Sequence, residues 1–426
     1  MIAMAKGKAT AWQGSEIRLA GMGVVSASST APAAAPTQAA ALPLRISLAI
    51  VLFTYLCVDI VSPALPAIQE SLALSGTSAG LIFSVFFAGR LVSNLPAAWL
   101  VERIGPKWTA VCGSIALLAG SALAASATSQ ATLLPARGIQ GVGVAVLATA
   151  GLLSVLRALP GGGAAMTAFN VSLGVGGSAG LLSGGYLTGE LGWRAIFWLS
   201  TAVAGLLLAG SLLARAQPAV ARPERAEVDD SIGTITDSRY GEVAAIAANL
   251  LVFINYSIWV VALPLLGAVK FGFNAGQVGL TLLFVNVVHL ASTFPIGVII
   301  RKAGAARTLA FGFTFGSIGL LLAPFAPTAP WLLAPMALYA IGQVAGNSSA
   351  GDLILRLGGG GGRAVGAVRL SSDVGLVAGP AAVGFLADAA GVEAPFFALG
   401  VTSMAAMAVA VAIGWRGPRL GRFTRG

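Results

Sequence analysis

The chain has 426 residues, of which 57% are hydrophobic and only 9% are charged. A soluble domain carries about 25% charged residues, so this composition excludes an ordinary soluble protein. The net charge of +10 does not indicate nucleic-acid binding, because Lys and Arg lie in short clusters between apolar runs, as in polytopic membrane proteins.

The apolar runs predict twelve transmembrane helices, since each crossing of a bilayer needs about 20 apolar residues. The first six begin near residues 44, 77, 108, 131, 163 and 193, and the second six near residues 243, 277, 307, 329, 364 and 394. A polar, proline-containing segment separates the two sets. We therefore expect a disordered cytoplasmic tail, an N-terminal bundle, a cytoplasmic linker, a C-terminal bundle and a basic cytoplasmic tail, over residues 1–43, 44–214, 215–242, 243–415 and 416–426.

Lys and Arg also predict the orientation. They gather in the tails and in alternate loops, while the opposite loops hold only Arg194 and Lys270. Cytoplasmic loops are enriched in Lys and Arg, so both termini are expected in the cytoplasm. The sequence thus predicts a multi-pass protein of the cell membrane, of the bacterial inner membrane in particular, that contacts the lipid bilayer and functions as a monomer.

The first two spans each contain an ionisable residue. Asp59 lies about fifteen residues into span one, roughly 22 Å along a helix. A charge at the bilayer centre costs about 2.5–3.5 kcal/mol, so such groups are functional candidates. We expect Asp59 to carry a proton, with a salt-bridged structural acid as the alternative. Arg90, in span two, either binds an anionic group of a substrate or balances Asp59.

The loop after span two reads AWLVERIGPK over residues 98–107, with Glu102, Arg103, Gly105 and Lys107. An acid and bases at helix ends can pair with one another and with helix dipoles, and so hold one face of a transporter shut. A weaker echo around Arg301 follows span eight, which indicates an internal repeat.

Spans four and five follow. Arg137 lies at a depth where it can contact Asp59 or a neighbouring helix, or else act as a cation at the rim. In span five, Gly176, Gly180 and Gly184 recur every four residues and share one helical face, which permits close packing on another helix.

These segments resemble signatures of the major facilitator superfamily, and in particular of its twelve-span drug:proton antiporters. The loop at 98–107 is similar to G-x-L-x-D-R-x-G-R-K, and Arg137 with Gln140 and Gly141 to R-x-x-Q-G. Span five is similar to G-P-x-x-G-G, with Gly180, Gly184 and Gly185 retained and Leu181 in place of proline. The resemblance implies two pseudo-symmetric six-helix bundles that rock around a site at the midplane. It also implies a role for Arg137 in proton coupling.

In this superfamily spans one, four, seven and ten line the central cavity. Residues that the resemblance places there, with aromatic or amide side chains suited to a largely apolar ligand, are Tyr55, Asn249, Asn255, Tyr256, Trp259, Tyr339 and Gln343. Asp373, in the first part of span eleven, is expected to act as an inner gate or helix cap rather than as a proton carrier. His289, the only histidine, is expected to pack.

Signatures of soluble enzymes are missing from the sequence. It contains no G-x-x-x-x-G-K-[ST] phosphate loop, no Cys–His metal spacing and no G-x-S-x-G elbow. We therefore expect no enzyme activity, cofactor or metal. The leading hypothesis is proton-coupled export of small amphipathic compounds. The alternatives are import or facilitated transport of a metabolite such as an organic acid, with Arg90 as its anchor, and a non-transporting membrane sensor.

Overall fold

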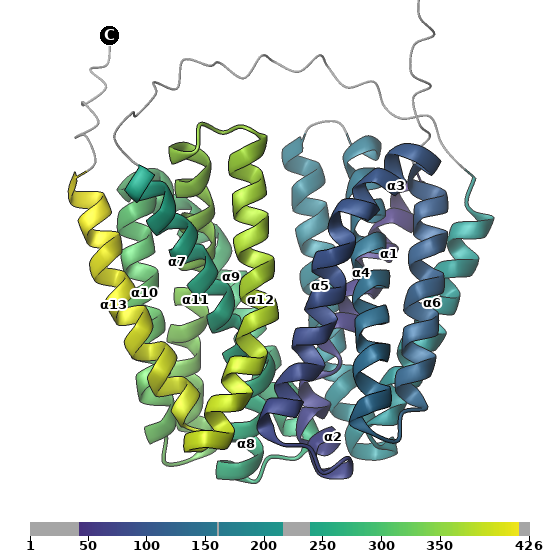
Figure 1. Cartoon of the computed structure of the whole chain (residues 1–426), viewed down its shortest axis with the longest axis horizontal. Coiled ribbons are helices and arrows are strands. Elements are labelled where there is room, and N and C mark those ends of the chain that lie inside the picture. The colour runs from purple at the N-terminus through teal and green to yellow at the C-terminus, as the bar shows by residue number, and fades with distance from the viewer. Residues whose placement is uncertain (1–41, 160–161, 216–238, 417–426) are drawn as a thin grey trace, which may run out of the picture. The chain divides into compact units, whose positions relative to one another are not determined.

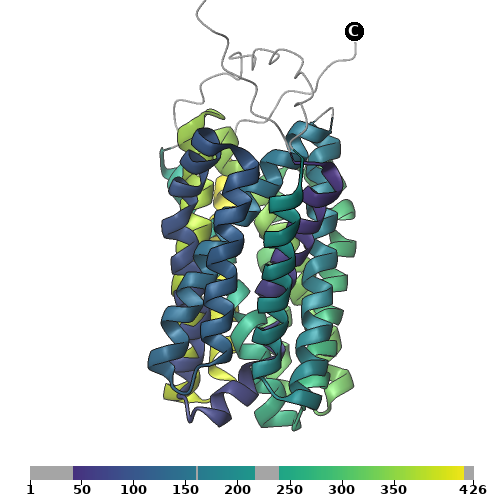
Figure 2. The ribbon, with the colours of Figure 1, turned by 90° about the vertical axis from the view of Figure 1, so that its right-hand side faces the viewer.

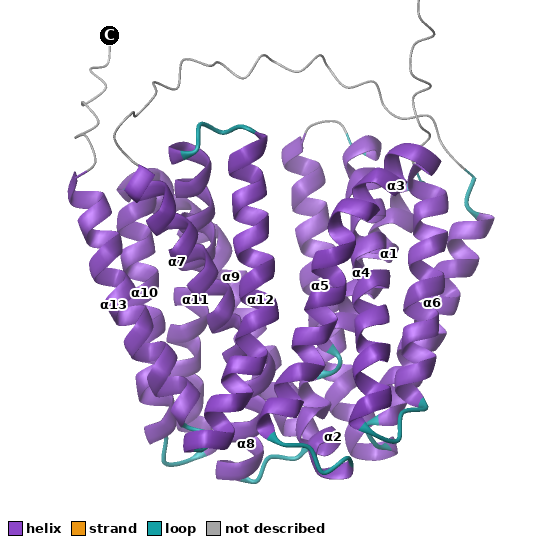
Figure 3. Ribbon diagram, in the orientation of Figure 1, coloured by secondary structure: helices purple, strands orange, loops and turns teal. Residues whose placement is uncertain are grey.

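The computed structural model describes residues 42–159, 162–215 and 239–416. These residues form helices joined by short connections, with no β-strand among them (Figure 3). The two expected tails fall almost wholly outside the described residues, and so does most of the expected linker. Its last residues, 239–242, belong to a helix instead.

Two sets of helices lie side by side (Figure 1). The N-terminal half comprises α1 (Leu44–Asp59), η1 (Ser62–Ala64), α2 (Leu65–Ser71), α3 (Gly76–Ala125), α4 (Gln130–Ala158), α5 (Gly162–Leu191) and α6 (Arg194–Leu213). The C-terminal half comprises α7 (Arg239–Ser257), η2 (Ile258–Ala262), α8 (Leu263–Phe271), α9 (Ala275–Ala303), α10 (Ala305–Leu322), η3 (Ala323–Phe325), α11 (Ala329–Leu357), α12 (Gly362–Ala390) and α13 (Ala394–Arg416).

Local sequence explains where several helices begin. Ser75 precedes α3 and accepts a hydrogen bond from the backbone N–H of Ser78 at 3.1 Å. Asn274 and Gln277 form a capping box at the start of α9. Such side chains satisfy N–H groups that have no partner within the helix, so they fix the first turn.

α3 contains two helices that meet at a kink. Gly105 has φ +79° and ψ 167°, a conformation that side chains disfavour, and Pro106 follows it. The expected spans near residues 77 and 108 therefore lie on either side of Gly105. Nine helices of the described residues are long and apolar enough to cross a membrane, with α3 counted once and with α11 and α13 not included.

The two halves contact each other along two helix pairs, α3 with α12 and α5 with α9. α2 and α8 also touch, at the lower end of the molecule in Figure 1. We refer to this lower end of the molecule as the α2/α8 end. The long helices run nearly parallel to one another when viewed from the side (Figure 2). The interface between the halves is therefore formed mainly by α3, α5, α9 and α12.

The glycines of α5 lie against helices of both halves. Gly176, Gly180 and Gly184 pack against the backbone of α1, where added Cβ atoms would meet the carbonyl oxygens of Leu52, Leu56 and Ile60. Gly185 faces α9, and a Cβ there would lie 3.3 Å from the Cα of Gly279. Small residues thus allow α5 to pack closely between α1 and α9.

Candidate functional site between the two halves

Asp59 ends α1 and lies between the halves. Its side chain is half-buried, and its Oδ1 accepts a long hydrogen bond of 3.5 Å from the Tyr256 hydroxyl of α7. Its Oδ2 faces Gly177 of α5, where a Cβ would collide with it. Among the described residues, no Lys or Arg forms an ion pair with Asp59. The acid is therefore available to a proton or to a cationic group.

Aromatic rings extend from Asp59 across the interface. The ring centroids of Phe87 in α3 and Tyr256 are 6.4 Å apart, those of Tyr256 and Trp259 5.9 Å, and those of Trp259 and His289 of α9 5.6 Å. Rings in such edge and tilted contacts attract one another and present electron-rich faces to a cation. An acid beside such rings suits an amphipathic or cationic ligand.

Trp259 belongs to a π-helical turn, Ile258–Ala262, that interrupts the helix running from α7 to α8. Such turns are rare in proteins as a whole, but many of those that occur lie at functional sites, because the extra residue redirects neighbouring side chains. Tyr256 and Trp259, two of the predicted cavity residues, lie together here. His289 packs edge-on against Trp259, and its buried Nδ1 has no hydrogen-bond partner among the described residues.

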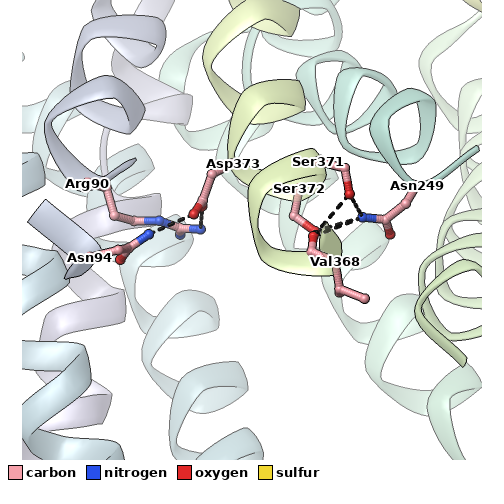
Figure 4. A network of polar contacts seen from close by, with 7 residues as sticks. All are labelled: Arg90, Asn94, Asn249, Val368, Ser371, Ser372 and Asp373. Carbon is pink, nitrogen blue, oxygen red and sulfur yellow. Dashed lines mark hydrogen bonds and ion pairs between the residues drawn. The ribbon is translucent and has the colours of Figure 1, made fainter. Parts of the chain in front are cut away.

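Arg90 pairs with Asp373 and not with Asp59. Arg90 Nη2 lies 2.8 Å from Asp373 Oδ1, and Asn94 Nδ2 donates to Asp373 Oδ2 at 2.7 Å (Figure 4). These bonds join α3 to α12, so they connect the two halves. The hypothesis that Arg90 balances Asp59 does not describe this structure, because Arg90 pairs with Asp373, whose side chain is only 5% exposed.

Asn249 occupies the other side of the same turn of α12. Its Nδ2 donates to the Val368 carbonyl and to the hydroxyls of Ser371 and Ser372, at 3.2, 2.8 and 2.9 Å (Figure 4). The placement of Asn249 as a ligand contact is therefore not what the structure shows: its amide is buried and ties α7 to α12. One turn of α12 thus contacts both halves.

Three further predicted cavity residues are buried inside the C-terminal half. Asn255 Nδ2 donates to Ser403 Oγ at 2.7 Å, the Tyr339 hydroxyl donates to the Asn255 carbonyl at 2.7 Å, and Gln343 Nε2 donates to the Val252 carbonyl at 3.2 Å. They line a small internal cavity among α7, α10, α11 and α13. They therefore pack this half rather than face the interface.

Tyr55 remains near Asp59 on α1. Its half-buried ring lies edge-on to the ring of Phe169 in α5, with centroids 6.4 Å apart. Of the seven predicted cavity residues, Tyr55, Tyr256 and Trp259 are therefore the ones that gather around Asp59.

Arg137 is fully buried and contacts α3. Its Nη1 donates to Gln140 Oε1 at 2.6 Å, its Nε donates to the Ile82 carbonyl at 3.4 Å, and its guanidinium lies 4.4 Å from the ring centre of Phe86. Of the two contacts expected for Arg137, the structure shows the neighbouring helix and not Asp59. It forms no ion pair with a carboxylate of the described residues, and its Nη2 has no hydrogen-bond partner among them.

The loop motif makes its contacts within the N-terminal half. Lys107 Nζ donates to the Ala214 carbonyl at 2.9 Å, just beyond the end of α6. The negative end of the α6 dipole stabilises a cation at this position. Arg103 is exposed and lies over the ring of Trp99. Glu102 is exposed as well, and so is Arg301 in the last turn of α9. The expected contact of these residues with the other half is not seen here, whereas Arg90 and Asn94 do contact Asp373 across the halves.

Three contributors were not predicted from the sequence. Asn94 lies one helical turn after Arg90, a spacing that signals a shared face. Phe87 lies three residues before Arg90, a spacing that also signals that face, whereas Asn286 carried no such signal. Asn286 Nδ2 donates to Ser178 Oγ at 2.9 Å and so joins α9 to α5. No cluster of three or more His, Cys, Asp or Glu side chains in the described part of the chain could hold a metal ion.

Apolar helices in two halves, with polar side chains between them, are the arrangement of secondary membrane transporters. The Major Facilitator Superfamily model matches residues 48–358 and 245–426, so this chain belongs to that superfamily. It is a multi-pass membrane transporter and not an enzyme.

Among characterised relatives, the multidrug efflux protein YfmO of Bacillus subtilis (strain 168) is 27% identical over 261 residues, 60% of this chain and 63% of that protein. The puromycin resistance protein pur8 of Streptomyces alboniger is 33% identical over 160 residues, 36% of this chain and 31% of that protein. The chain thus matches less than two thirds of the length of either relative.

A solved structure shows a similar arrangement of helices. It is a bacterial homologue of the human lysosomal transporter Spinster, in an inward-facing and occupied conformation. The TM-score is 0.73 at 15% identity, and the match covers 88% of this chain and 96% of that chain. At this identity the likeness concerns the fold.

Proposed function

We propose that the protein exports small amphipathic compounds in exchange for protons, by alternating access. The observation that carries the proposal is Asp59, a carboxylate between the halves that has one long hydrogen bond and no cationic partner among the described residues. Relatives named for multidrug efflux and puromycin resistance support export.

The chemistry of exchange follows from the surroundings of Asp59. An unpaired charge at this depth is costly, so either a proton or a cationic group of a substrate lowers the free energy when it binds. One carboxylate cannot hold both, since the proton removes the charge that attracts the cation. Competition at Asp59 therefore couples proton entry to substrate release, and the rings of Tyr256 and Trp259 bind the apolar part of the substrate.

The same geometry weighs against organic acids as substrates. Arg90 is the cation that an organic acid would need, and it is already bound to Asp373. The structure thus lends no specific support to the importer hypothesis. We assign Arg90, Asn94 and Asp373 to a gate that joins the halves, and buried Arg137 to the coupling of α4 with α3.

For the whole protein we propose twelve crossings in two six-helix halves, over residues 44–214 and 243–415. The kink at Gly105 divides α3 into two crossings, and α11 and α13 complete the twelve. The Lys and Arg pattern favours cytoplasmic termini, so we place the α2/α8 end at the outer face of a bacterial inner membrane. We further propose that the protein works as a monomer, with residues 1–43, 216–238 and 417–426 in the cytoplasm.

Transport by the purified protein in liposomes tests this proposal. With an imposed pH gradient, ethidium or puromycin should move against its own gradient in exchange for protons, and benzoate should not. Asp59→Asn should reduce the exchange to the level of empty liposomes. Asp352→Asn is the matched control, because Asp352 pairs with Arg356 one turn away in the same helix, α11. Wild-type flux that is equal with and without the pH gradient would contradict proton coupling.

A further inference from the structure

Asp388, in the last turn of α12, binds the first turn of α3 in the other half. Its Oδ1 accepts a hydrogen bond from the Gly76 N–H at 2.6 Å, and its Oδ2 accepts from the Thr77 N–H at 2.8 Å and the Thr77 hydroxyl at 2.7 Å. The first N–H groups of a helix lack partners within that helix, and a carboxylate is a strong acceptor for them. Asp388 therefore caps α3 from the opposite half.

The position of Asp388 in its own helix makes this contact informative. α12 ends at Ala390, so the carboxylate lies at the negative end of the α12 dipole, where an acid is unfavourable. The positive end of the α3 dipole reverses that effect as long as the two helices touch. The acid is thus stabilised by the contact between the halves and not by its own helix.

The backbones of the two helices approach closely at the same place. A Cβ on Gly76 would lie 2.7 Å from Asp388 Oδ1 and 2.8 Å from the Gly384 carbonyl oxygen, closer than real Cβ atoms come. Farther along, Ser84 Oγ accepts a hydrogen bond from the Ala381 N–H at 3.0 Å. The contact therefore continues from Gly76 for about two turns toward the centre of the molecule.

We propose that Asp388 is a positioning residue of the transport cycle: its carboxylate keeps the α2/α8 end closed by capping α3, and it releases Gly76 and Thr77 when that end opens. We name the contact of Asp388 with Gly76 and Thr77 the α3–α12 latch. The proposal rests on alternating access, but it requires neither proton coupling nor a particular substrate. Because Asp388 itself is exposed, breaking the latch places the acid and the α3 N–H groups in water.

The rate of cysteine alkylation tests the latch. Ser84 is buried against α12, so Ser84→Cys, with Cys57 and Cys112 replaced by alanine, reports whether α3 and α12 have separated. The purified full chain in lipid nanodiscs is treated with N-ethylmaleimide in the absence of substrate. Asp388→Asn should raise the alkylation rate about tenfold, since it removes the charge behind three hydrogen bonds.

The matched control is Glu393→Gln. Glu393 lies near the same end and pairs with Lys270 at 2.8 Å, but both residues belong to the C-terminal half. This variant should alkylate at the parent rate. Thr77→Val removes a single bond of the latch and should raise the rate about threefold, which keeps the test decisive should Asp388→Asn fold poorly. Rates for Asp388→Asn and Thr77→Val equal to that of Glu393→Gln would overturn the latch, whatever the outcome of proton-flux measurements.

Discussion

Asp59 and Asp373 both lie between the halves, but they differ in their partners. Asp373 has both carboxylate oxygens occupied, one by Arg90 and one by Asn94. Within the described part of the chain, Asp59 has only the Tyr256 hydroxyl, at 3.5 Å. An acid whose two oxygens are both bonded is held in its contact, whereas an acid with one distant partner can still bind another group. Proton exchange is therefore argued for Asp59, and contact between the halves for Asp373.

The pair of Arg90 with Asp373 gives a prediction on stability. In a double-mutant cycle of Arg90→Gln and Asp373→Asn, we expect a coupling free energy of about 1–2 kcal/mol. This is below the cost of breaking a fully buried pair, because 24% of the Arg90 side chain is exposed. Denaturant unfolding in detergent measures it. The same cycle on Asp352 and the more exposed Arg356 should give less, and a coupling near zero for Arg90 and Asp373 would contradict their role in joining the halves.

At this scale the sequence predicted the residues better than their partners. Asp59, Arg90 and Asp373 stand out because charges are rare within apolar spans. Arg90 pairs with Asp373 and not with Asp59 because of how helices from distant parts of the chain pack. Arg90 and Asp373 are separated by 283 positions. Spacing within one helix carries no information about such a contact.

Among the elements, α5 shows most clearly how sequence determines packing. The four-residue spacing of Gly176, Gly180 and Gly184 predicted one close-packed face, and the structure places that face on α1. The neighbouring glycines that face α9 belong to a second surface that the spacing alone did not indicate. α5 can therefore contact both halves along its length.

Substitution within α5 tests this packing. In Gly180→Ala the new Cβ would lie 3.2 Å from the Ile60 N and closer to the Leu56 carbonyl oxygen, so α5 or α1 must shift. We expect the free energy of unfolding to fall by about 1–3 kcal/mol. Gly189→Ala is the control, because nothing lies within 4 Å of a Cβ at position 189 of the same helix. The apparent melting temperatures compare the two, and equal values would show that the contact of α5 with α1 contributes little.

The polar residues of α7 and α11 show where prediction from sequence fails. Helices that are apolar on all sides have no distinct polar face, so the pattern cannot tell which side meets the interface. Asn255, Tyr339 and Gln343 were therefore predicted to contact a ligand. In the structure their side chains form hydrogen bonds with other residues of the C-terminal half. Only the packed structure orients a helix around its axis.

For the whole molecule, composition and span length predicted a helical membrane protein, and the superfamily match confirms the class. The fold required little beyond apolar segments of sufficient length. The way in which the halves meet was not predictable, because it depends on the glycine contacts and on two acids of α12. Asp388 closes the α2/α8 end and Asp373 joins α3 to α12 nearer the centre.

Different contacts join the halves at the α2/α8 end and nearer the centre. The α3–α12 latch and the glycine contacts of α5 with α9 hold the α2/α8 end, while the contact of Arg90 with Asp373 lies deeper between the halves. Binding of a proton or a substrate at Asp59 can shift the balance between the two states only if its affinity for them differs. Tyr256 of α7 and Gly177 of α5 lie against Asp59, so a movement of either helix changes the surroundings of the acid.

Proton release on substrate binding tests the central claim, the competition at Asp59. The purified protein in weakly buffered detergent solution is mixed with ethidium or puromycin, and a pH indicator records the change. We expect the wild-type protein to release protons in proportion to the compound bound, and Asp59→Asn to bind without releasing any. Equal proton release by Asp59→Asn and the wild-type protein would contradict the account.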